Sequence, residues 1–381
     1  MTVGTEAIVV LGSGLAGWTT VRELRKLDSA TPVTVITADA GDFYAKPSLS
    51  NAFAQGKRPD QLVSTPAARM AESLGATLLA NTRVEAIDRA ATTVVTDKGR
   101  VPYGRLVLAT GAEPIRVPLA GNAAGEVRSV NSLDDFALFH AQLRPGAHVA
   151  IMGAGLIGCE FANDLAGAGY RVSVIDPSTR PLAALLPEQA SQALRSALES
   201  LGVQFHFGTT VASVHRDGEQ LRLGLADGDG FDADVVLSAV GLRADTTLAR
   251  AAGLSCGRGI VVDSSLATSD PAIFALGDCA EYAGGRCLPY VLPIMSAARV
   301  LAARLAGREG TLAFGLMPVS IKTPALPLVV ASPAAAGGGN WHEHEEGMWH
   351  FLDGGGLARG FVLAGKQTSR RAEMAQRMAA V

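Results

Sequence analysis

The sequence AIVVLGSGLAG at residues 7–17 decides the fold of this 381-residue chain. An apolar run suited to a buried strand leads into Gly12, and glycines at 14 and 17 complete the spacing GxGxxG. A helical pattern follows, and a second β-rich run over residues 32–37 ends shortly before Asp39. This order of strand, turn, helix and strand is typical of parallel sheets, so the opening predicts an α/β fold built around a glycine-rich turn.

The same order recurs near the middle of the chain. HVAIMGAGLIG at residues 148–158 precedes a helical pattern through Ala168, a strand pattern over 171–175 and then Asp176. The two motifs lie 153 − 12 = 141 positions apart. Two copies of one unit predict two Rossmann-like dinucleotide-binding domains. Two unrelated structural turns are the alternative, but their joint occurrence in the required context favours dinucleotide binding.

Each motif needs its glycines for separate physical reasons. The first allows a tight turn, the second lets backbone N–H groups approach a pyrophosphate, and the third lets helix and strand pack closely. The N-terminus of the helix then stabilises the phosphate charge. The residues predicted to hold a dinucleotide at the two turns are Gly12, Gly14, Leu15, Ala16 and Gly17 in the first and Gly153, Gly155, Leu156, Ile157 and Gly158 in the second.

Acidic residues after the second strand of each unit indicate which dinucleotide binds. Asp176 lies 176 − 158 = 18 positions after the last motif glycine, near the ~20 expected of a carboxylate that bonds a ribose 2′-hydroxyl. Because a carboxylate repels a 2′-phosphate, NADH is favoured over NADPH, although Arg180 supplies one nearby cation. In the first unit Asp39 is the candidate for a ribose, with Thr37, or a merely solvated Asp39, as alternatives.

Composition narrows the class of protein. Thirty-three Lys and Arg against 36 Asp and Glu give a net charge of −3, which disfavours a nucleic-acid binder or a polybasic membrane-surface protein. With 48% hydrophobic and 18% charged residues, the chain has ample material for a core. Four cysteines without a CxxC motif indicate a reducing compartment, and no signal peptide or long apolar stretch is recognised. We therefore expect a cytoplasmic protein.

Beyond about residue 315 the pattern changes to short β-prone pieces and a basic helical end, which predicts a small α+β domain. A Gly/Ala-rich stretch around 332–339 is expected to be an exposed loop. His342 and His344 fall on one face of a probable strand, with His350 nearby, but no further ligand pair supports a metal site. A solvated hairpin is the favoured interpretation, and no metal is predicted.

Several motifs together carry a resemblance to known proteins. The two glycine motifs, Ala109-Thr-Gly111 and Ala275-Leu-Gly-Asp278 resemble the FAD-dependent pyridine nucleotide–disulfide oxidoreductase superfamily. GAEPIRVP at 111–118, GAGLIGCEFANDL at 153–165 and IKTPA at 321–325 are similar to bacterial rubredoxin–NAD reductases. The similarity runs over essentially the whole chain.

The resemblance implies FAD in the first site, NADH in the second and a glutathione-reductase-like architecture. The FAD-binding domain would comprise residues 1–114 and 237–314, with the NAD-binding domain, 115–236, inserted and a C-terminal domain at 315–381. Asp278 would bond the flavin ribityl or phosphate region, and a helix N-terminus at Ile294 and Met295 would stabilise charge on the reduced flavin. The resemblance further assigns Asp39, Lys46, Pro47, Val84, Thr110, Gly111 and Lys322 to FAD, and Glu160, Asp176 and Gly241 to NAD.

Cysteine is absent where superfamily members that reduce disulfides carry a redox pair. The corresponding segment here, YAKPSLS at 44–50, contains none, and Cys159 and Cys279 are interpreted as packing residues. The resemblance then implies that the flavin takes a hydride from NADH and passes single electrons directly to rubredoxin. The alternatives are a ferredoxin- or flavorubredoxin-type carrier, an NADH oxidase, and a nucleotide-binding sensor with little turnover.

Lys46, Glu160 and Lys322 are predicted to act near the reacting atoms. Lys46 stands where related ferredoxin reductases carry arginine, while a later lysine of theirs is replaced here by Asn51. The hypothesis is that Lys322 supplies the lost charge and pairs with Glu160 or the flavin; an ordinary surface lysine is the alternative. Rubredoxins are acidic, and from Gly355 on five Lys and Arg against one Glu give 5 − 1 = +4, which predicts a docking face or, equally, a solvated tail.

Overall fold

The computed structural model describes residues 7–333 and 338–379. The chain divides into two compact units, each assembled from three separate segments. Unit 1 comprises Met1–Ala45, Val63–Glu113 and Leu242–Phe314, and unit 2 comprises Lys46–Leu62, Pro114–Gly241 and Gly315–Val381. Within the described residues, no helix is long and apolar enough to cross a membrane.

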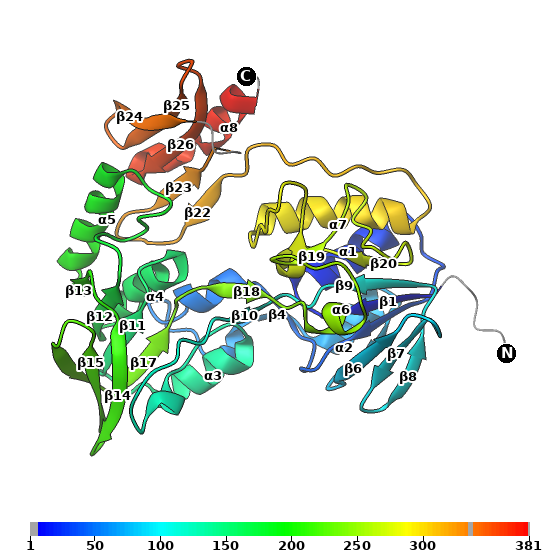
Figure 1. Ribbon diagram of the computed structural model, residues 1–381, viewed down its shortest axis with the longest axis horizontal. Helices are drawn as coiled ribbons and strands as arrows, with labels where there is room; N and C mark the ends of the chain where they lie inside the picture. Colours follow the sequence, from blue (N-terminus) through cyan, green and yellow to red (C-terminus); the bar gives the residue numbers. More distant parts are fainter. Residues whose placement is uncertain (1–6, 334–337, 380–381) are drawn as a thin grey trace. The chain divides into compact units, whose positions relative to one another are not determined.

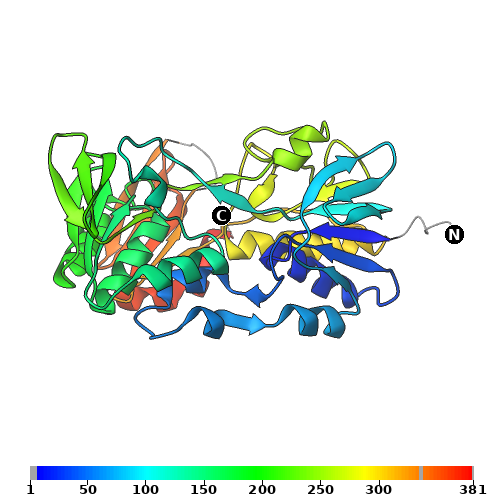
Figure 2. The same ribbon diagram turned by 90° about the horizontal axis from the view of Figure 1, so that it is seen from below.

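Unit 1 is built around a five-stranded parallel sheet of order β20-β9-β1-β2-β5. Its strands are β1 (Ile8–Leu11), β2 (Val33–Ile36), β5 (Thr77–Leu79), β9 (Arg105–Leu108) and β20 (Ile273–Ala275). Every residue of β1 is at most 2% exposed, as expected of a parallel strand covered on both faces. The helices are α1 (Leu15–Arg25), α2 (Ala67–Ser73), α6 (Thr247–Ala251) and α7 (Val291–Leu305). Helices α1 and α7 pack side by side (Figure 1, Figure 2).

Smaller elements complete unit 1. An antiparallel sheet consists of β6 (Val84–Asp88), β7 (Thr93–Thr96) and β8 (Gly99–Pro102). Short pairs are formed by β3 (Phe43–Tyr44) with β4 (Val63–Thr65), β10 (Ala112–Pro114) with β18 (Leu242–Ala244), and β19 (Ile260–Val261) with β21 (Ala280–Glu281). A 3₁₀ turn, η4 (Gly277–Cys279), follows β20.

Unit 2 contains a four-stranded parallel sheet of order β13-β12-β11-β17. Its strands are β11 (His148–Met152), β12 (Arg171–Asp176), β13 (Gln204–Phe207) and β17 (Val235–Ser238), and its helices are α3 (Leu133–Gln142), α4 (Leu156–Gly167) and α5 (Glu188–Ser200). An antiparallel sheet of β14 (Val211–Asp217), β15 (Gln220–Leu225) and β16 (Gly230–Ala233) is also present. The 3₁₀ turns of this part are η1 (Lys46–Asn51), η2 (Pro59–Leu62) and η3 (Ala124–Glu126).

The C-terminal part of unit 2 is an antiparallel sheet of order β22-β23-β26-β25-β24 with a helical end. Its elements are β22 (Val319–Ile321), β23 (Leu328–Ala331), β24 (Gly339–Glu345), β25 (Met348–Asp353), β26 (Ala358–Ala364), η5 (Gly365–Arg370) and α8 (Arg371–Ala379). Phe361 and Leu363 form a small core with Val329 and with Met374 of α8. This agrees with the predicted α+β region.

The predicted secondary structure differs from the structure mainly at element ends. The helix expected from Pro293 begins two residues earlier, at Val291. The loop expected over 332–339 has its centre, residues 334–337, outside the described residues. Segment 46–62 groups with unit 2, although the predicted domains place it with the first dinucleotide site. The domain boundaries stay a prediction.

Candidate dinucleotide sites and the polar face of helix α4

The first glycine motif forms a tight turn between β1 and α1. Gly12 has φ +106°, and a Cβ there would overlap the Ala109 carbonyl oxygen. A Cβ on Gly17 would overlap the Gly12 carbonyl oxygen, whereas nothing in the described residues lies within 4 Å of a Cβ on Gly14. Gly14 caps α1 without a side-chain hydrogen bond, and the first turn carries no acid. This open backbone with uncompensated N–H groups fits the pyrophosphate of a dinucleotide.

The second motif repeats these features between β11 and α4. A Cβ on Gly153 would lie 2.7 Å from the Ala239 carbonyl oxygen, and one on Gly158 would overlap the Gly153 carbonyl oxygen. Gly155 faces open space within the described structure and caps α4, whose first turn also lacks an acid. Leu156 and Ile157 open this helix, as Leu15 and Ala16 open α1. Both turns therefore have the same physical design.

Asp39 and Thr37 form one hydrogen-bonded group at the end of β2. The Asp39 Oδ1 accepts from Thr37 Oγ1 at 2.6 Å and from the Gly41 backbone N–H at 2.9 Å. Ser13, inside the glycine turn, also donates to this oxygen at 3.3 Å. Asp39 is exposed and Thr37 is buried, so Asp39 is the better placed of the two alternatives to meet a ribose.

Asp176 lies at the end of β12, against the second glycine turn. Its Oδ2 accepts from the Ala154 backbone N–H at 2.6 Å, and its Oδ1 accepts from the Ser178 backbone N–H at 2.8 Å and hydroxyl at 2.5 Å. The Arg180 guanidinium donates instead to the Ala183 carbonyl at 3.4 Å. The carboxylate is thus held in one orientation beside the turn.

Turn η4 brings Asp278 to the beginnings of two helices. A Cβ on Gly277 would lie 2.9 Å from Ala16 Cβ and 3.9 Å from Ile294 Cγ1. Ile294 and Met295 fall near the start of α7, where no acid is present in the first turn. The Gly277 N–H donates to the Tyr282 hydroxyl at 3.1 Å, a contact that sequence reasoning missed.

The remaining predicted backbone positions lie in turns and at strand ends. Gly111 has φ +75°, and its carbonyl accepts from the Asp245 N–H at 3.0 Å, while Thr110 Oγ1 donates to the Asp245 carbonyl. Val84 begins β6 and is half-buried. Gly241 has φ +114°, and its carbonyl accepts from the Ile115 N–H at 3.0 Å. Conformations with positive φ explain glycine at 111 and 241.

Glu160, Lys322 and Pro47 lie together in unit 2. The carboxylate of Glu160, 3% exposed, accepts from Ser50 Oγ at 2.6 Å and from the backbone N–H of Lys322 at 2.9 Å. The Lys322 ammonium donates to the Pro47 carbonyl at 3.1 Å. Of the two predicted partners of the Lys322 ammonium, Glu160 binds the lysine backbone N–H instead, because the side chain extends across to η1. The other predicted partner, the flavin, stays a prediction.

Burial dominates the electrostatics of Glu160. Desolvation raises the pKa of its carboxyl, while the Ser50 hydroxyl, the Lys322 N–H and the Lys322 charge work in the opposite direction. Lys46 lies in the same unit, and its ammonium donates to Asn131 Oδ1 at 3.0 Å. Lys46, Pro47 and Lys322 are predicted to meet FAD, but they belong to unit 2, so their place relative to the Gly12 turn stays a prediction.

Sequence reasoning missed two further polar residues of α4. Asn163 and Asp164 are 4% and 3% exposed and accept hydrogen bonds from distant backbone. The available signal was the occurrence of three polar residues at 160, 163 and 164 in an otherwise apolar helix. That spacing places them on one face.

The thiols have the character of packing groups. Cys159 and Cys279 are fully buried, and their S–H groups lie within hydrogen-bond distance of the carbonyls of Ala154 and Leu276. Burial raises the pKa of both, and all four cysteines are free. These environments disfavour a reactive thiolate.

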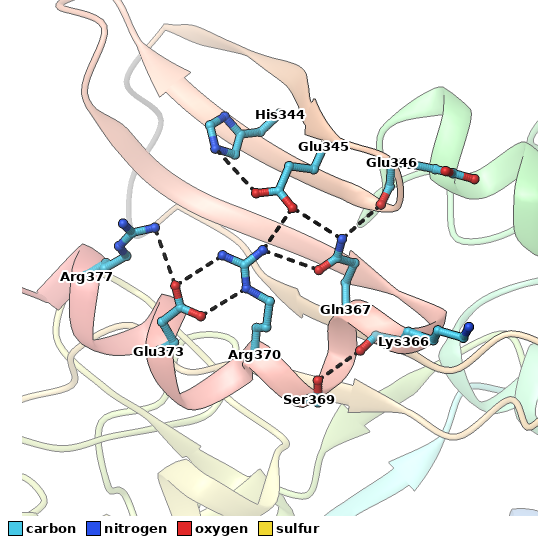
Figure 3. A network of polar contacts seen from close by, with 9 residues as sticks. All are labelled: His344, Glu345, Glu346, Lys366, Gln367, Ser369, Arg370, Glu373 and Arg377. Atoms are coloured by element: carbon cyan, nitrogen blue, oxygen red, sulfur yellow. Dashed lines mark hydrogen bonds and ion pairs between the residues drawn. The ribbon is translucent and has the colours of Figure 1, made fainter.

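Three of the five cations from Gly355 on form ion pairs, and two of these three pair with acids that precede this segment. Figure 3 shows Arg370 between Glu345 and Glu373, with Arg377 also on Glu373. Arg359 pairs with Asp353. Of the five tail cations, Lys366 and Arg371 enter no ion pair with a described residue, and Arg371 donates to Ser320 Oγ at 3.2 Å. The net count of +4 therefore overstates the charge available to a partner.

Three of the histidines, His342, His344 and His350, lie on the β24–β25 hairpin. His342 is opposite His350, whose ring stacks on that of His344 at 4.6 Å between centroids. Within the part of the chain that the structure describes, no three His, Cys, Asp or Glu side chains are grouped to hold a metal ion.

Comparison with known proteins identifies the family. Residues 6–307 match the model of the pyridine nucleotide-disulphide oxidoreductases, and residues 311–378 match that of a rubredoxin binding C-terminal domain. The chain therefore belongs to the pyridine nucleotide-disulphide oxidoreductase family. The predicted fold class and family resemblance are confirmed.

Individual relatives cover nearly the whole chain. A rubredoxin-NAD(+) reductase of Alcanivorax borkumensis is 45% identical over 380 residues, covering 98% of this chain and 99% of the relative. A nitric oxide reductase FlRd-NAD(+) reductase of Aeromonas hydrophila is 40% identical over 368 residues, covering 95% and 94%. Among solved structures, the covalent putidaredoxin reductase–putidaredoxin complex matches with a TM-score of 0.88 and 26% identity, covering 98% and 93% of the two chains.

Proposed function

We propose that this protein is an FAD-dependent enzyme that takes reducing equivalents from NADH and delivers electrons to rubredoxin. The observation that carries this proposal is the pair of equivalent glycine turns, each with an open backbone at the helix N-terminus, in a chain that also matches a rubredoxin binding domain. FAD, when bound, is able to accept a hydride and release electrons singly. Everything else required of the protein is binding, orientation and control of charge.

The first glycine turn is proposed to bind FAD and the second to bind NADH. Backbone N–H groups after Gly14 and Gly155 would bind the phosphates, while Asp176 at the end of β12 and Asp39 shortly after β2 would meet the ribose hydroxyls. Asp176 is held by three hydrogen bonds and would repel a 2′-phosphate. NADH is therefore the proposed donor. Asp176→Ala should lower the preference for NADH, measured as kcat/KM for NADH divided by kcat/KM for NADPH.

Lys46, Glu160 and Lys322 are proposed to control charge near the reacting atoms. Lys322 combines an exposed ammonium with a backbone held by buried Glu160. A fixed cation at this position would stabilise negative charge developing on a nearby acceptor. Substitution Lys322→Met tests this role: a wild-type hydride-transfer rate with an unchanged flavin potential would exclude it.

Stopped-flow measurement of NADH oxidation with purified rubredoxins and ferredoxins tests the function as a whole. We expect rapid reduction of the enzyme by NADH, followed by rapid reduction of rubredoxin. A colourless purified protein that takes up no added FAD would refute the proposal. Turnover with oxygen alone, at the rate seen with rubredoxin, would instead identify an NADH oxidase.

A flavorubredoxin-type carrier is the second candidate. The observation that favours it is the similarity to the Aeromonas hydrophila FlRd-NAD(+) reductase over 95% of this chain. Including such a carrier in the same panel distinguishes the two, because kcat/KM should be highest for the physiological acceptor.

We also propose a cytoplasmic location. NADH is the proposed donor, and all four cysteines are free, as is typical of a reducing compartment. Cell fractionation with an antibody to the protein tests this, and recovery with a membrane or secreted fraction would contradict it.

A further inference from the structure

Helix α4 holds two distant segments of unit 2 through one face. Glu160, Asn163 and Asp164 are all at most 4% exposed and follow the i, i+3, i+4 spacing of a single helical face. Each side chain accepts a hydrogen bond from outside the helix. The partners lie in residues 50–54 and 322–325, more than 100 positions away in either direction.

Asp164 holds the end of the segment that begins with Lys46. Its two carboxylate oxygens accept from the backbone N–H groups of Phe53 and Ala54, both at 2.9 Å. Two bonds to one carboxylate fix the orientation of the chain at that point, directly after turn η1.

Asn163 performs the equivalent role for the second segment. Its Oδ1 accepts from the backbone N–H of Ala325 at 3.0 Å. Between Lys322 and Ala325, Thr323 is fully buried, and its hydroxyl donates to the Leu326 carbonyl at 2.7 Å. The Lys322 backbone is thus held at its own N–H by Glu160 and three residues later by Asn163.

The two segments also meet each other. The Lys322 ammonium donates to the Pro47 carbonyl, one residue after Lys46. A shift of either segment relative to α4 would break this bond, because a hydrogen bond weakens steeply with distance and angle. The location of both lysines therefore depends on the same helix face.

We propose that Asn163 and Asp164 are positioning residues for the lysine-bearing site, with Asn163 fixing Lys322 and Asp164 fixing Lys46. The consequence for electron transfer rests on the proposed function, but the positioning itself does not. Burial of an unpaired polar group is costly, so both side chains need these backbone partners. A merely structural role would loosen the backbone at Ala325 or at residues 53–54 and leave the reactivity of the two lysines unchanged.

Amide exchange and lysine labelling of the full-length holoprotein test the proposal without an electron acceptor. Asn163→Leu removes the acceptor oxygen, Asn163→Asp replaces the amide oxygen by a carboxylate oxygen that also accepts, and Asp164→Asn removes one of two acceptor oxygens. Amide exchange is followed by mass spectrometry at residues 53–54 and 325. The reactivity of the Lys46 and Lys322 amines is followed with an acetylating reagent.

We expect a crossed pattern. Asn163→Leu should speed exchange at Ala325 about tenfold and change the labelling of Lys322, with residues 53–54 and Lys46 unaffected. Asp164→Asn should do the reverse, and Asn163→Asp should restore the exchange rate at Ala325. Equal changes in both segments, or none in either, would overturn the proposal.

A double-mutant cycle then connects positioning to the reaction. If Asn163 acts through Lys322, Asn163→Leu should lower the rate of reduction by NADH in the wild-type background and have no further effect in Lys322→Met. Additive effects would show that Asn163 does not act through the lysine. Failure of the wild-type protein to reduce any carrier would refute the proposed function and leave the labelling results intact.

Discussion

The hydrogen bonds of the Glu160 carboxylate predict how two substitutions of this residue change the stability of helix α4. It is 3% exposed and accepts from Ser50 Oγ at 2.6 Å and from the Lys322 N–H at 2.9 Å. Glu160→Gln keeps the shape, and its amide is able to accept from the Lys322 N–H and donate to the Ser50 hydroxyl. Glu160→Leu has similar bulk and makes neither bond.

The two variants should differ clearly in stability. Glu160→Leu leaves the buried Ser50 hydroxyl and the partly buried Lys322 N–H without this acceptor, at about 1–3 kcal/mol each for full burial, so the free energy of local opening of α4 should fall by up to about 6 kcal/mol. Glu160→Gln replaces two charge-assisted bonds by neutral ones, a loss of about 1 kcal/mol per bond, and this is offset by removal of a buried charge. At neutral pH, Glu160→Gln should change the free energy of local opening of α4 by no more than about 2 kcal/mol.

The pH dependence has a definite sign. Burial raises the pKa of Glu160 above its ordinary value of 4.5, so the folded state binds a proton more readily than the unfolded state does. This stronger proton binding by the folded state stabilises it fully below the pKa that Glu160 has in the unfolded state. The stabilisation is lost as pH rises through the pKa that Glu160 has in the folded state. Wild-type protein should therefore lose stability relative to Glu160→Gln as pH rises through that range.

Native-state hydrogen exchange of the α4 amides, measured from pH 4.5 to 8, checks both points. Because exchange itself depends on pH, rates are compared with those of the α5 amides of the same sample. The reasoning is refuted if Glu160→Leu and Glu160→Gln open α4 equally, or if wild type gains stability relative to Glu160→Gln as pH rises.

Three further outcomes follow from the sites. Gly17→Ala should destabilise unit 1 and lower FAD content, because the added carbon overlaps the Gly12 carbonyl, whereas Gly14→Ala should fold and weaken cofactor binding; equal thermal stability of the two variants would contradict this. Arg371→Gln should raise the KM for an acidic carrier at low salt more than Arg359→Gln does, since Arg359 is already paired with Asp353; identical salt dependence would argue against it. Alkylation of accessible thiols should leave turnover with rubredoxin unchanged, and loss of activity would implicate sulfur chemistry.

Local patterns were enough to predict the two dinucleotide-binding units. The strands beside Gly12 and Gly153 are continuous apolar runs, and the turn and helix that follow each one are local in sequence, so period and glycine spacing identify them. The positions of Asp176, the last residue of β12, and of Asp39, three residues after β2, were also predictable, because both are local to the second strand of their unit. Their contacts with a ribose stay a prediction. The absence of cysteine from η1 was also informative, because it is read from residue type alone and indicates that this segment carries no redox-active thiol.

Pairing across long stretches of chain could not be read in this way. The cations Arg370 and Arg377 are neutralised by Glu373 and, for Arg370, by Glu345 of a hairpin 25 positions earlier. A count of charges along the tail treats them all as free. The Lys322 contact with Pro47 spans 275 positions, and which of its groups meets Glu160 depends on how the backbone runs there.

Sequence alone determined that this chain carries two glycine motifs of the dinucleotide-binding type and no cysteine at residues 44–50, because those features depend on residue type and short spacing. Only the tertiary structure decided that α4 gathers Glu160, Asn163 and Asp164 onto the backbones of two remote segments. The physical reason is that a buried polar side chain must find a partner, and the fold determines which distant N–H group lies within reach.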